Sequence, residues 1–129
     1  MVIASTRKRV FKSKRFSKTA DKSSITDNEL CLAISEIEQG FAENLGGGVY
    51  KKRLKQNEWR SIVLTKGGAI WVYQHLFAKK DQANIAVNEL LGLKLLAKAY
   101  ANLTANQIDR LIQSNDLQEI CHDQPPLQK

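Results

Sequence analysis

The stretch VYKKRLKQNEWRSIVLTKGG, residues 49–68, decides the fold and raises the question of function. Its side chains alternate over residues 49–54 and again over 59–66, a pattern typical of strands. The short segment KQNE between them predicts an antiparallel hairpin. The hairpin carries one acid, Glu58, against six bases, which are Lys51, Lys52, Arg53, Lys55, Arg60 and Lys66. Such a surplus of positive charge on a sheet suggests a polyanionic partner.

Flanking residues extend the hairpin into a small sheet. The turn sequence KGG leads into a further strand, predicted over residues 69–78. Near the N-terminus, residues 9–16 alternate loosely, which predicts a first strand that runs into a short helical turn. The sequence therefore predicts four strands, and the last three form an antiparallel meander because their connections are short.

Helical patterns occupy the rest of the chain. Thr26 followed by Glu29 makes a capping box at the start of a helix. The glycines at 46–48 are expected to end this helix, since glycine tolerates the positive φ of a C-cap. A long apolar run over 85–103 predicts the most buried helix of the chain, and another capped helix begins at Thr104.

These elements follow the order β-α-α-β-β-β-α-α. The order predicts an α+β domain in which a small antiparallel sheet has helices packed on one face. A length of 129 residues suits one domain with a core of its own. We therefore expect a single domain over residues 1–120 and a disordered tail over 121–129.

Positive charge is concentrated in two parts of the chain. Lys and Arg number 20 against 13 Asp and Glu, a net charge of +7. Residues 1–20 hold seven bases and no acid, and residues 49–80 hold eight bases and one acid, so these segments contain 15 of the 20 cations. This distribution favours nucleic acid or an acidic protein segment over a small substrate, with a merely basic surface as the alternative.

The sequence indicates a cytoplasmic protein without metal or cofactor. No apolar run approaches the ~18 residues of a membrane span, and the first residues do not resemble a secretory signal. Cys31 and Cys121 are expected to be reduced thiols, although a disulfide is possible. Cys121, His122 and Asp123 are neighbours in a polar tail, an arrangement that rarely converges on one ion, so no metal site is predicted.

The cations of the hairpin divide between the two faces of the sheet. Side chains alternate along a strand, so Lys51 and Arg53 share a face with Val49, while Lys52 points to the opposite, core-facing side. Arg60 on the next strand could join Lys51 and Arg53 on the open face, but its place in an apolar alternation requires a bulge or a twisted strand start. Gathered cations repel one another, and a phosphate backbone would neutralise them.

Two segments, YKKRLKQNEWRSIVL and VYQHLFAKKDQANI, resemble the RelE/HigB-type toxins of bacterial toxin–antitoxin pairs, small proteins that cut messenger RNA on the ribosome. The resemblance spans residues 9–120, and the order of elements agrees. In RelE, one strand carries a tyrosine, a lysine, an apolar residue, a lysine and a leucine, and the next opens with an aromatic residue and an arginine. Those places are taken here by Tyr50, Lys51, Lys52, Arg53, Leu54, Trp59 and Arg60. A later RelE motif of glycine, basic residues and an acid corresponds to residues 78–81.

The resemblance implies cleavage of RNA without a metal. The ribose 2′-oxygen attacks the adjacent phosphate and yields a 2′,3′-cyclic phosphate and a 5′-hydroxyl. Charge gathers on the phosphate oxygens in the transition state, where preorganised cations stabilise it. By resemblance, Arg60 grips the phosphate with its planar fork, and Lys51 and Arg53 stabilise the charge. Lys80 corresponds to an arginine that contacts the scissile region.

The proton-transferring residue is less clear from the pattern. RelE has a tyrosine shortly after the basic motif, where this chain reads QANIAV. Tyr73 or His75, expected on one face of their strand with Trp71 and Phe77, could replace it, and a histidine suits proton transfer near neutral pH. The alternatives are a core position for Tyr73 and an exposed, non-catalytic position for His75. Trp59 or Trp71 could stack on a base, but a buried position is the default for tryptophan.

The remaining cations are expected to hold RNA without taking part in chemistry, because phosphate contacts position a protein on nucleic acid. They are Arg7, Lys8, Arg9, Lys12, Lys52 and Lys79. The implied partners are the ribosome, messenger RNA and an antitoxin protein, expected to carry a helix-turn-helix DNA-binding domain and to cover the basic sheet face or dock on the helices. Two other functions stay open: a module that binds RNA or the ribosome without cutting, and a protein poison like the gyrase-inhibiting ParE members of the superfamily.

Overall fold

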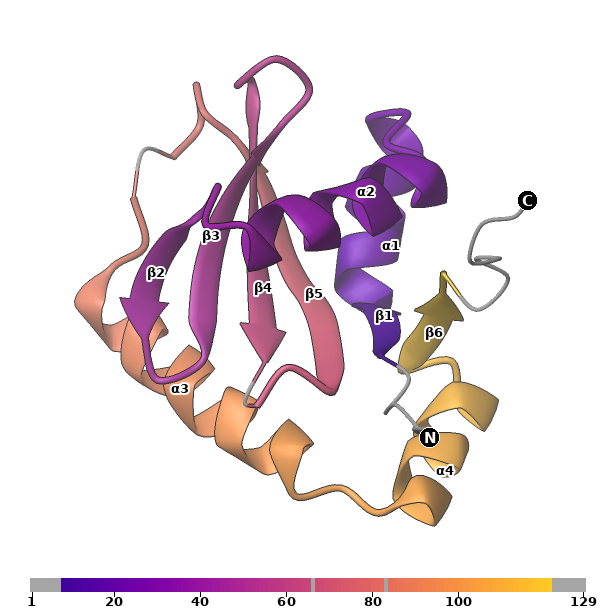
Figure 1. The fold of residues 1–129 in the computed structure, drawn as a ribbon. Coiled ribbons are helices and arrows are strands. Elements are labelled where there is room, and N and C mark those ends of the chain that lie inside the picture. Colours follow the sequence, from indigo (N-terminus) through magenta and orange to yellow (C-terminus); the bar gives the residue numbers. More distant parts are fainter. Residues whose placement is uncertain (1–7, 66, 83, 122–129) are drawn as a thin grey trace.

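Six strands form one mixed sheet in the computed structural model, which describes residues 8–65, 67–82 and 84–121 (Figure 1). The strands are β1 (Arg9–Ser13), β2 (Glu43–Gly46), β3 (Val49–Leu54), β4 (Trp59–Thr65), β5 (Ile70–Ala78) and β6 (Leu117–Ile120). They lie in the order β2-β3-β4-β5-β1-β6, and all neighbours are antiparallel except β1 and β5. The α+β class and the meander of β3, β4 and β5 are confirmed. The sheet is mixed, and not antiparallel throughout as predicted, because a long connection with two helices separates β1 from β5.

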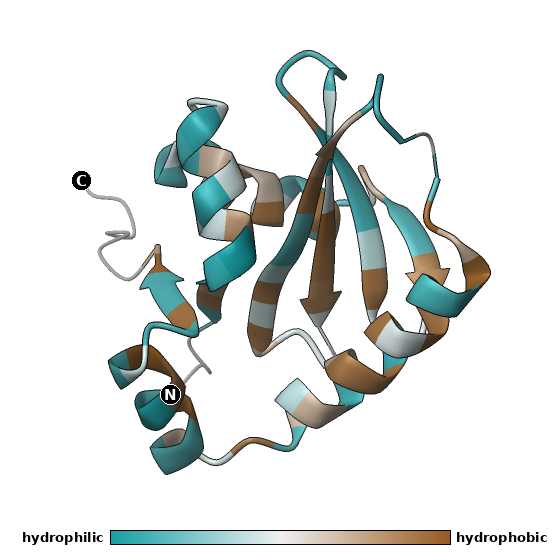
Figure 2. Cartoon of the chain, turned by 180° about the vertical axis from the view of Figure 1, so that it is seen from behind, coloured by the Kyte–Doolittle hydropathy of each residue, from teal (hydrophilic) through white to brown (hydrophobic). Residues whose placement is uncertain are grey.

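Helices cover both faces of the sheet, and not one face as predicted (Figures 1 and 2). One face, called the α2 face, carries α1 (Lys14–Lys22) and α2 (Asp27–Glu38), and the other, called the α3 face, carries α3 (Val87–Ala101) and α4 (Ala105–Gln113). The central strands explain this arrangement, because Val63 packs in the core of the α2 face and its neighbours Ile62 and Leu64 pack in the core of the α3 face. A sheet that is apolar on both sides needs a cover on each side.

Two short edge strands, β2 and β6, were not predicted. The expected helix from Thr26 to the glycines ends at Glu38, and Gly40, with a φ of +97°, follows its cap. Glycines 46–48 instead make the tight turn between β2 and β3, where all three have positive φ. A Cβ on Gly48 would lie 2.4 Å from the carbonyl oxygen of Thr65, so this position needs glycine. Strands of four residues are too short for alternation to reveal them.

The apolar composition of α3 predicted that it would be the most buried helix, and this prediction is wrong. Ala97 is its only buried residue, while Val87, Leu91 and Leu95 are 73%, 56% and 70% exposed. Its inner side packs on the α3 face, and its outer side has no cover among the described residues. None of the helices within the described residues has both the length and the apolar character to cross a membrane.

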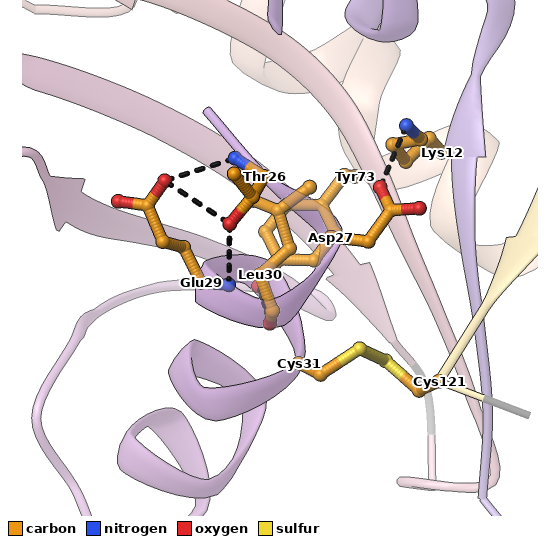
Figure 3. Close-up of a disulfide and its surroundings, with 8 residues drawn as sticks. All are labelled: Lys12, Thr26, Asp27, Glu29, Leu30, Cys31, Tyr73 and Cys121. Carbon is orange, nitrogen blue, oxygen red and sulfur yellow. Dashed lines mark hydrogen bonds and ion pairs between the residues drawn. A yellow bond between two sulfur atoms is a disulfide. The ribbon is translucent and has the colours of Figure 1, made fainter. Parts of the chain in front are cut away.

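A disulfide joins Cys31 on α2 to Cys121 just after β6 (Figure 3), where reduced thiols were predicted. The cysteines are 90 residues apart in the chain, and their Cα atoms are 5.7 Å apart in the fold, within the usual range for a disulfide. Both pack against the core of the α2 face. Only the docking of α2 beside the β1–β6 edge brings them together, which is why the sequence did not show the pair. Residue 121 is therefore anchored, and the rest of the tail predicted over 121–129 lies outside the described residues.

Candidate nucleic-acid interface

Lys51, Arg53 and Arg60 point to the α3 face of the sheet. In the register of β3 and β4, Arg53 lies opposite Arg60 and Lys51 lies opposite Ile62. Directly opposite residues share a face, so the cations stand on the same side as Ile62. The conflict expected for Arg60 does not arise, because this face has its own apolar core at one end and its cations at the other. No bulge is needed at the start of β4.

The end of the α3 face that carries these cations has no helix over it. α3 crosses the sheet near the β2–β3 turn, where a Cβ on Gly48 would lie 3.3 Å from the Cβ of Ala97. Figure 2 shows α3 across one end of the strands and the opposite end, with the β3–β4 turn, without a helix in front of it. Arg53 and Arg60 lie at that opposite end, next to the turn. The helix arrangement leaves a basic surface accessible on this half of the face.

The cations of this surface differ in how far they are committed to other groups. Arg53 is exposed, and its side chain makes no ion pair or hydrogen bond with another described residue. Lys51 is held by Glu43 on β2, with 3.1 Å between Nζ and the carboxylate oxygen. Arg60 is only 6% exposed, and its Nη1 donates to the carbonyl oxygen of Asn57 at 2.8 Å. Arg53 therefore carries the most accessible cationic group of the three.

Tyr73 is a core residue and not part of this surface. β5 has a bulge at Gln74, since Val63 pairs with Tyr73 while Ile62, the residue before it, pairs with His75. Tyr73 faces α2, is fully buried, and donates its hydroxyl proton to the carbonyl oxygen of Leu30 at 2.6 Å. Burial raises the pKa of Tyr73 far above its usual value. Its hydroxyl cannot serve as a proton carrier for RNA.

His75 lies on the α3 face with Phe77, and its ring centroid is 5.3 Å from that of Phe77. The expectation that Tyr73 and His75 share a face is wrong, because the bulge shifts the alternation by one residue. His75 is half-buried, and its Nδ1 is buried without a hydrogen-bond partner in the described part of the chain. It lines a cavity of about 210 Å³ between β5, α1 and α3. A buried polar atom without a hydrogen-bond partner is uncommon in folded proteins, and it is often found where a residue has a functional role.

The surroundings of His75 favour a neutral imidazole. Burial lowers the pKa of His75 below its usual 6.5, and the charge of Arg15 on α1 lowers it further. Glu89 on α3 and the side chain of Gln82 act in the opposite direction on this pKa. The net shift is downward, so the ring is neutral at pH 7 and can accept a proton.

Cations predicted to bind RNA on the other side are neutralised by the acidic residues of α2. Lys12 Nζ lies 2.8 Å from Asp27, and its side chain is only 6% exposed (Figure 3). Lys52 Nζ lies 3.0 Å from Glu36. The other acids of α2 are also paired, Glu29 with Lys55 and Glu38 with Lys8. Arg9 makes two hydrogen bonds to Glu119.

Three of the predicted cations remain to be placed. Lys79 and Lys80 follow β5 and are exposed, and neither side chain has a partner among the residues the structure describes. They line a cavity at the β3–β4 turn together with Trp59. Arg7 lies outside the described residues. The structure thus brings Lys79 and Lys80 close to the turn that separates Arg53 from Arg60.

Sequence patterns did not single out Arg15 and Glu43. Arg15 belongs to a run of bases in which nothing distinguishes it, and only the start of α1 after Ser13 sets it beside His75. Glu43 meets Lys51 because β2 pairs with β3, and β2 itself was not predicted. Neither residue had a local signal, since each depends on pairing between distant segments.

Comparison with protein-family models decides the family. The model described as the RelE toxin of the RelE/RelB toxin–antitoxin system matches residues 8–120. The chain belongs to the RelE toxin family. This RelE protein is accordingly a toxin of a toxin–antitoxin pair, and the family implies an antitoxin as its partner. No curated protein matches the chain.

Proposed function

We propose that this RelE toxin cleaves messenger RNA on the ribosome. The observation that carries the proposal is that Lys51, Arg53, Arg60 and His75 all lie on the α3 face, with Arg53 and Arg60 at its open end and His75 beside α3. The cations can bind a phosphate, and the imidazole can move a proton. No metal is needed for this chemistry, because the side chains supply both charge stabilisation and proton transfer.

Cleavage would proceed by internal transfer within the RNA. His75 takes the proton from the ribose 2′-hydroxyl as the 2′-oxygen bonds to phosphorus. The bond from phosphorus to the 5′-oxygen breaks, and that oxygen takes up a proton from water to become a hydroxyl, while His75 later releases its proton to the solvent. The products are a 2′,3′-cyclic phosphate and a 5′-hydroxyl end. A neutral imidazole suits the first of these proton transfers, and because Nδ1 is buried the proton would go to Nε2.

Arg53 takes the role of phosphate ligand that resemblance gave to Arg60. Arg53 is exposed, whereas Arg60 is only 6% exposed and one of its guanidinium nitrogens donates a hydrogen bond to the carbonyl oxygen of Asn57. A guanidinium that reaches solvent can grip two phosphate oxygens, and a buried one cannot turn to do so. Arg60 contributes its positive charge to the same surface from a buried position, and its hydrogen bond to Asn57 stabilises the β3–β4 turn. Lys51 is the second residue that stabilises the negative charge of the phosphate. It can do so when the phosphate displaces Glu43 from its ion pair with Lys51.

The test uses purified protein and ribosomes programmed with a defined messenger RNA. Primer extension maps the fragments. The 5′-hydroxyl end is read by direct labelling with a polynucleotide kinase, without phosphatase treatment, and the 2′,3′-cyclic phosphate is read by the resistance of the other fragment to 3′-end ligation and to periodate oxidation. We expect cleavage within the decoded segment. Binding to ribosomes without any cut would show a binding module, and inhibition of gyrase without a cut would show a ParE-like poison.

The outer side of α3 suits the antitoxin. Val87, Leu91 and Leu95 follow one another at four-residue spacing, and all three are more than half exposed. Lys94 and Lys98 flank this apolar stripe, and Glu89, the single acid of α3, accepts a hydrogen bond at the start of the helix instead. Apolar residues edged by lysines fit an amphipathic helix with acidic flanks. We propose that such a helix of the antitoxin, which we expect to carry a helix-turn-helix domain, docks here.

Co-purification tests this docking site. The toxin is expressed together with the small protein encoded beside it, and only the toxin carries an affinity tag. Leu91→Gln with Leu95→Gln should release the partner, while cleavage by the free toxin stays unchanged. Leu32→Gln is the matched control, because Leu32 is 68% exposed but lies on α2. Retention of the partner by the double variant would place the antitoxin elsewhere.

A further inference from the structure

The β3–β4 turn and the end of β5 enclose a cavity of about 690 Å³. Its walls include Gln56, Asn57, Glu58, Trp59, Lys79 and Lys80. We infer that this cavity, at the tip of the hairpin that carries Arg53, binds one unpaired nucleobase of the RNA. The inference rests on the proposed function, since it names the part of the substrate that is read next to the cleavage site.

The backbone of the turn is unusual. Lys55, Gln56 and Asn57 are three consecutive residues with left-handed φ values of 51°, 55° and 76°, and none is a glycine. Residues with side chains seldom adopt this conformation singly, and a run of three is rarer. Glycine would relieve the turn, but it would also remove two amide side chains. Retention of costly backbone conformations is typical of binding sites.

The turn is held rigidly in place. Arg60 Nη1 donates to the carbonyl oxygen of Asn57 at 2.8 Å. The Lys79 amide donates to the carbonyl oxygen of Glu58 at 2.9 Å, which ties the turn to the end of β5. The Glu58 amide closes the turn onto the carbonyl oxygen of Lys55 at 3.1 Å. The cavity is therefore formed before any ligand arrives, which reduces the entropy lost on binding.

The wall groups match a base better than a phosphate or a peptide. Trp59 is half-buried against the core of the α2 face and also lines the cavity, so its indole offers an apolar surface on which a base can lie. The amides of Gln56 and Asn57 each provide donors and an acceptor, and neither has a partner among the described side chains. Such groups read the edges of bases that are not paired.

The cavity is lined by both positive and negative side chains, and their charges determine which part of a nucleotide can bind there. Lys79 and Lys80 supply cations for the phosphates on either side of a bound nucleotide. Glu58 is an acceptor and repels a phosphate placed inside the cavity, but it can accept from an exocyclic amino group. The walls therefore favour adenine, cytosine or guanine, which carry such a group, over uracil, which does not.

Fluorescence of Trp59 provides a direct readout. The chain has two tryptophans, so Trp71→Phe leaves Trp59 as the only one. Because Trp71 is 4% exposed and packs in the core, circular dichroism should check that this variant keeps the fold. The probes are the four nucleoside 5′-monophosphates, a short single-stranded RNA and inorganic phosphate. We expect quenching by the RNA and by the amino-bearing nucleotides, weaker quenching by uridine monophosphate, and none by phosphate.

Two glycine variants separate the side chains from the backbone. Gln56→Gly and Asn57→Gly keep the left-handed turn accessible and remove one amide each. Each should weaken nucleotide binding by about tenfold and reduce the difference among bases. Lys79→Ala with Lys80→Ala should weaken all four nucleotides alike. Lys14→Ala with Lys18→Ala removes the same charge from a different cavity, between α1 and β6, and should leave the quenching unchanged.

Three results would overturn the inference. They are quenching by phosphate equal to that by nucleotides, absence of quenching by the RNA, and glycine variants that bind like the parent. A failure of the base site can be distinguished from a failure of the proposed nuclease function, because messenger RNA cleavage is measured separately on ribosomes. Cleavage without quenching rejects the base site alone. Quenching without cleavage keeps the base site and rejects the nuclease.

Discussion

The two faces of the sheet differ in how completely their cations are paired. On the α2 face, Lys52 is paired with Glu36 and the buried Lys12 is paired with Asp27. On the α3 face, Arg53 is exposed and has no partner in the described part of the chain. The number of cations in a segment therefore does not locate a nucleic-acid interface. The acids of the covering helix decide which cations remain available to a polyanion.

Each acid of α2 takes part in this neutralisation. All four acidic residues of the helix are in ion pairs with bases from β1, β3 or the segments beside them. α3 contributes no acid to an ion pair with the sheet, and it leaves half of its face uncovered. Replacement of residues on the two faces should therefore give different results.

The largest effect is expected for His75→Gln. A general base typically contributes about 100- to 10,000-fold to a rate, so single-turnover cleavage should fall by that range while RNA binding stays near that of the parent. The pKa of His75 is lowered, so the parent rate should be constant from neutral pH to below pH 6.5 and then fall as the ring gains a proton. The variant should lack this acidic decline. An unchanged rate in the variant would exclude His75 as the base.

Arg53→Ala should have the next largest effect. Loss of one transition-state stabiliser typically costs about 100- to 1000-fold in rate. Lys52→Ala is the matched comparison, because Lys52 precedes Arg53 in β3, points to the other face and is paired with Glu36. Rates at saturating protein should separate the two variants. Equal losses in both would show that the faces do not differ in function.

The position of α2 depends in part on the disulfide. Cys31→Ser with Cys121→Ser should lower the free energy of unfolding by about 2–4 kcal/mol, because the bridge closes a loop of 90 residues and restricts the unfolded chain. Chemical denaturation, with and without a reductant for the parent, measures this difference. Cleavage at a temperature where the variant is folded should be retained, since the basic surface on the α3 face does not contain the bridge. Equal stability of oxidised parent and variant would contradict the expectation.

A smaller effect is expected for Glu43→Gln. Glu43 holds Lys51 at 3.1 Å and neutralises a cation of the open surface. Its removal should release Lys51 and raise RNA affinity a few-fold at low salt, with a steeper salt dependence, because one more cation meets phosphate. Affinity measured over a series of salt concentrations tests this. Weaker binding would mean that Glu43 positions Lys51 for RNA and does not compete with it.

Local patterns predicted the elements that are stabilised locally. The capping box of Thr26 and Glu29 forms as expected, with the Glu29 amide donating to the Thr26 hydroxyl at 3.2 Å and the Thr26 amide donating to the Glu29 carboxylate at 2.9 Å. The β3–β4 hairpin also forms, since alternation and a short connection lie within one segment. β2 and β6 depend on partners that are distant in the chain, so a four-residue pattern could not show them.

The site was predictable up to the first irregularity in the sheet. Alternation correctly set Lys51 and Arg53 on one face, because β3 has a regular register with β4. It failed for Tyr73 and His75, because the bulge at Gln74 adds one residue and reverses every later side chain. A bulge has no reliable mark in a strand without glycine or proline. Burial of Tyr73 and exposure of the His75 ring to a cavity thus became visible only in the structure.

The smallest effect is expected on the covered face. Lys52→Ala should change the cleavage rate by less than about twofold, since Lys52 already meets Glu36 at 3.0 Å and a partly exposed pair contributes only about 0.2–1 kcal/mol to stability. Glu36→Gln is the informative counterpart, because it removes the acid and leaves the cation. If α2 excludes RNA by neutralising charge, Glu36→Gln should raise RNA affinity slightly and Lys52→Ala should not lower it. If the helix excludes RNA by covering the face, neither variant should change affinity. Filter binding at low salt distinguishes the outcomes, and a clear loss of affinity in Lys52→Ala would show that RNA reaches the α2 face after all.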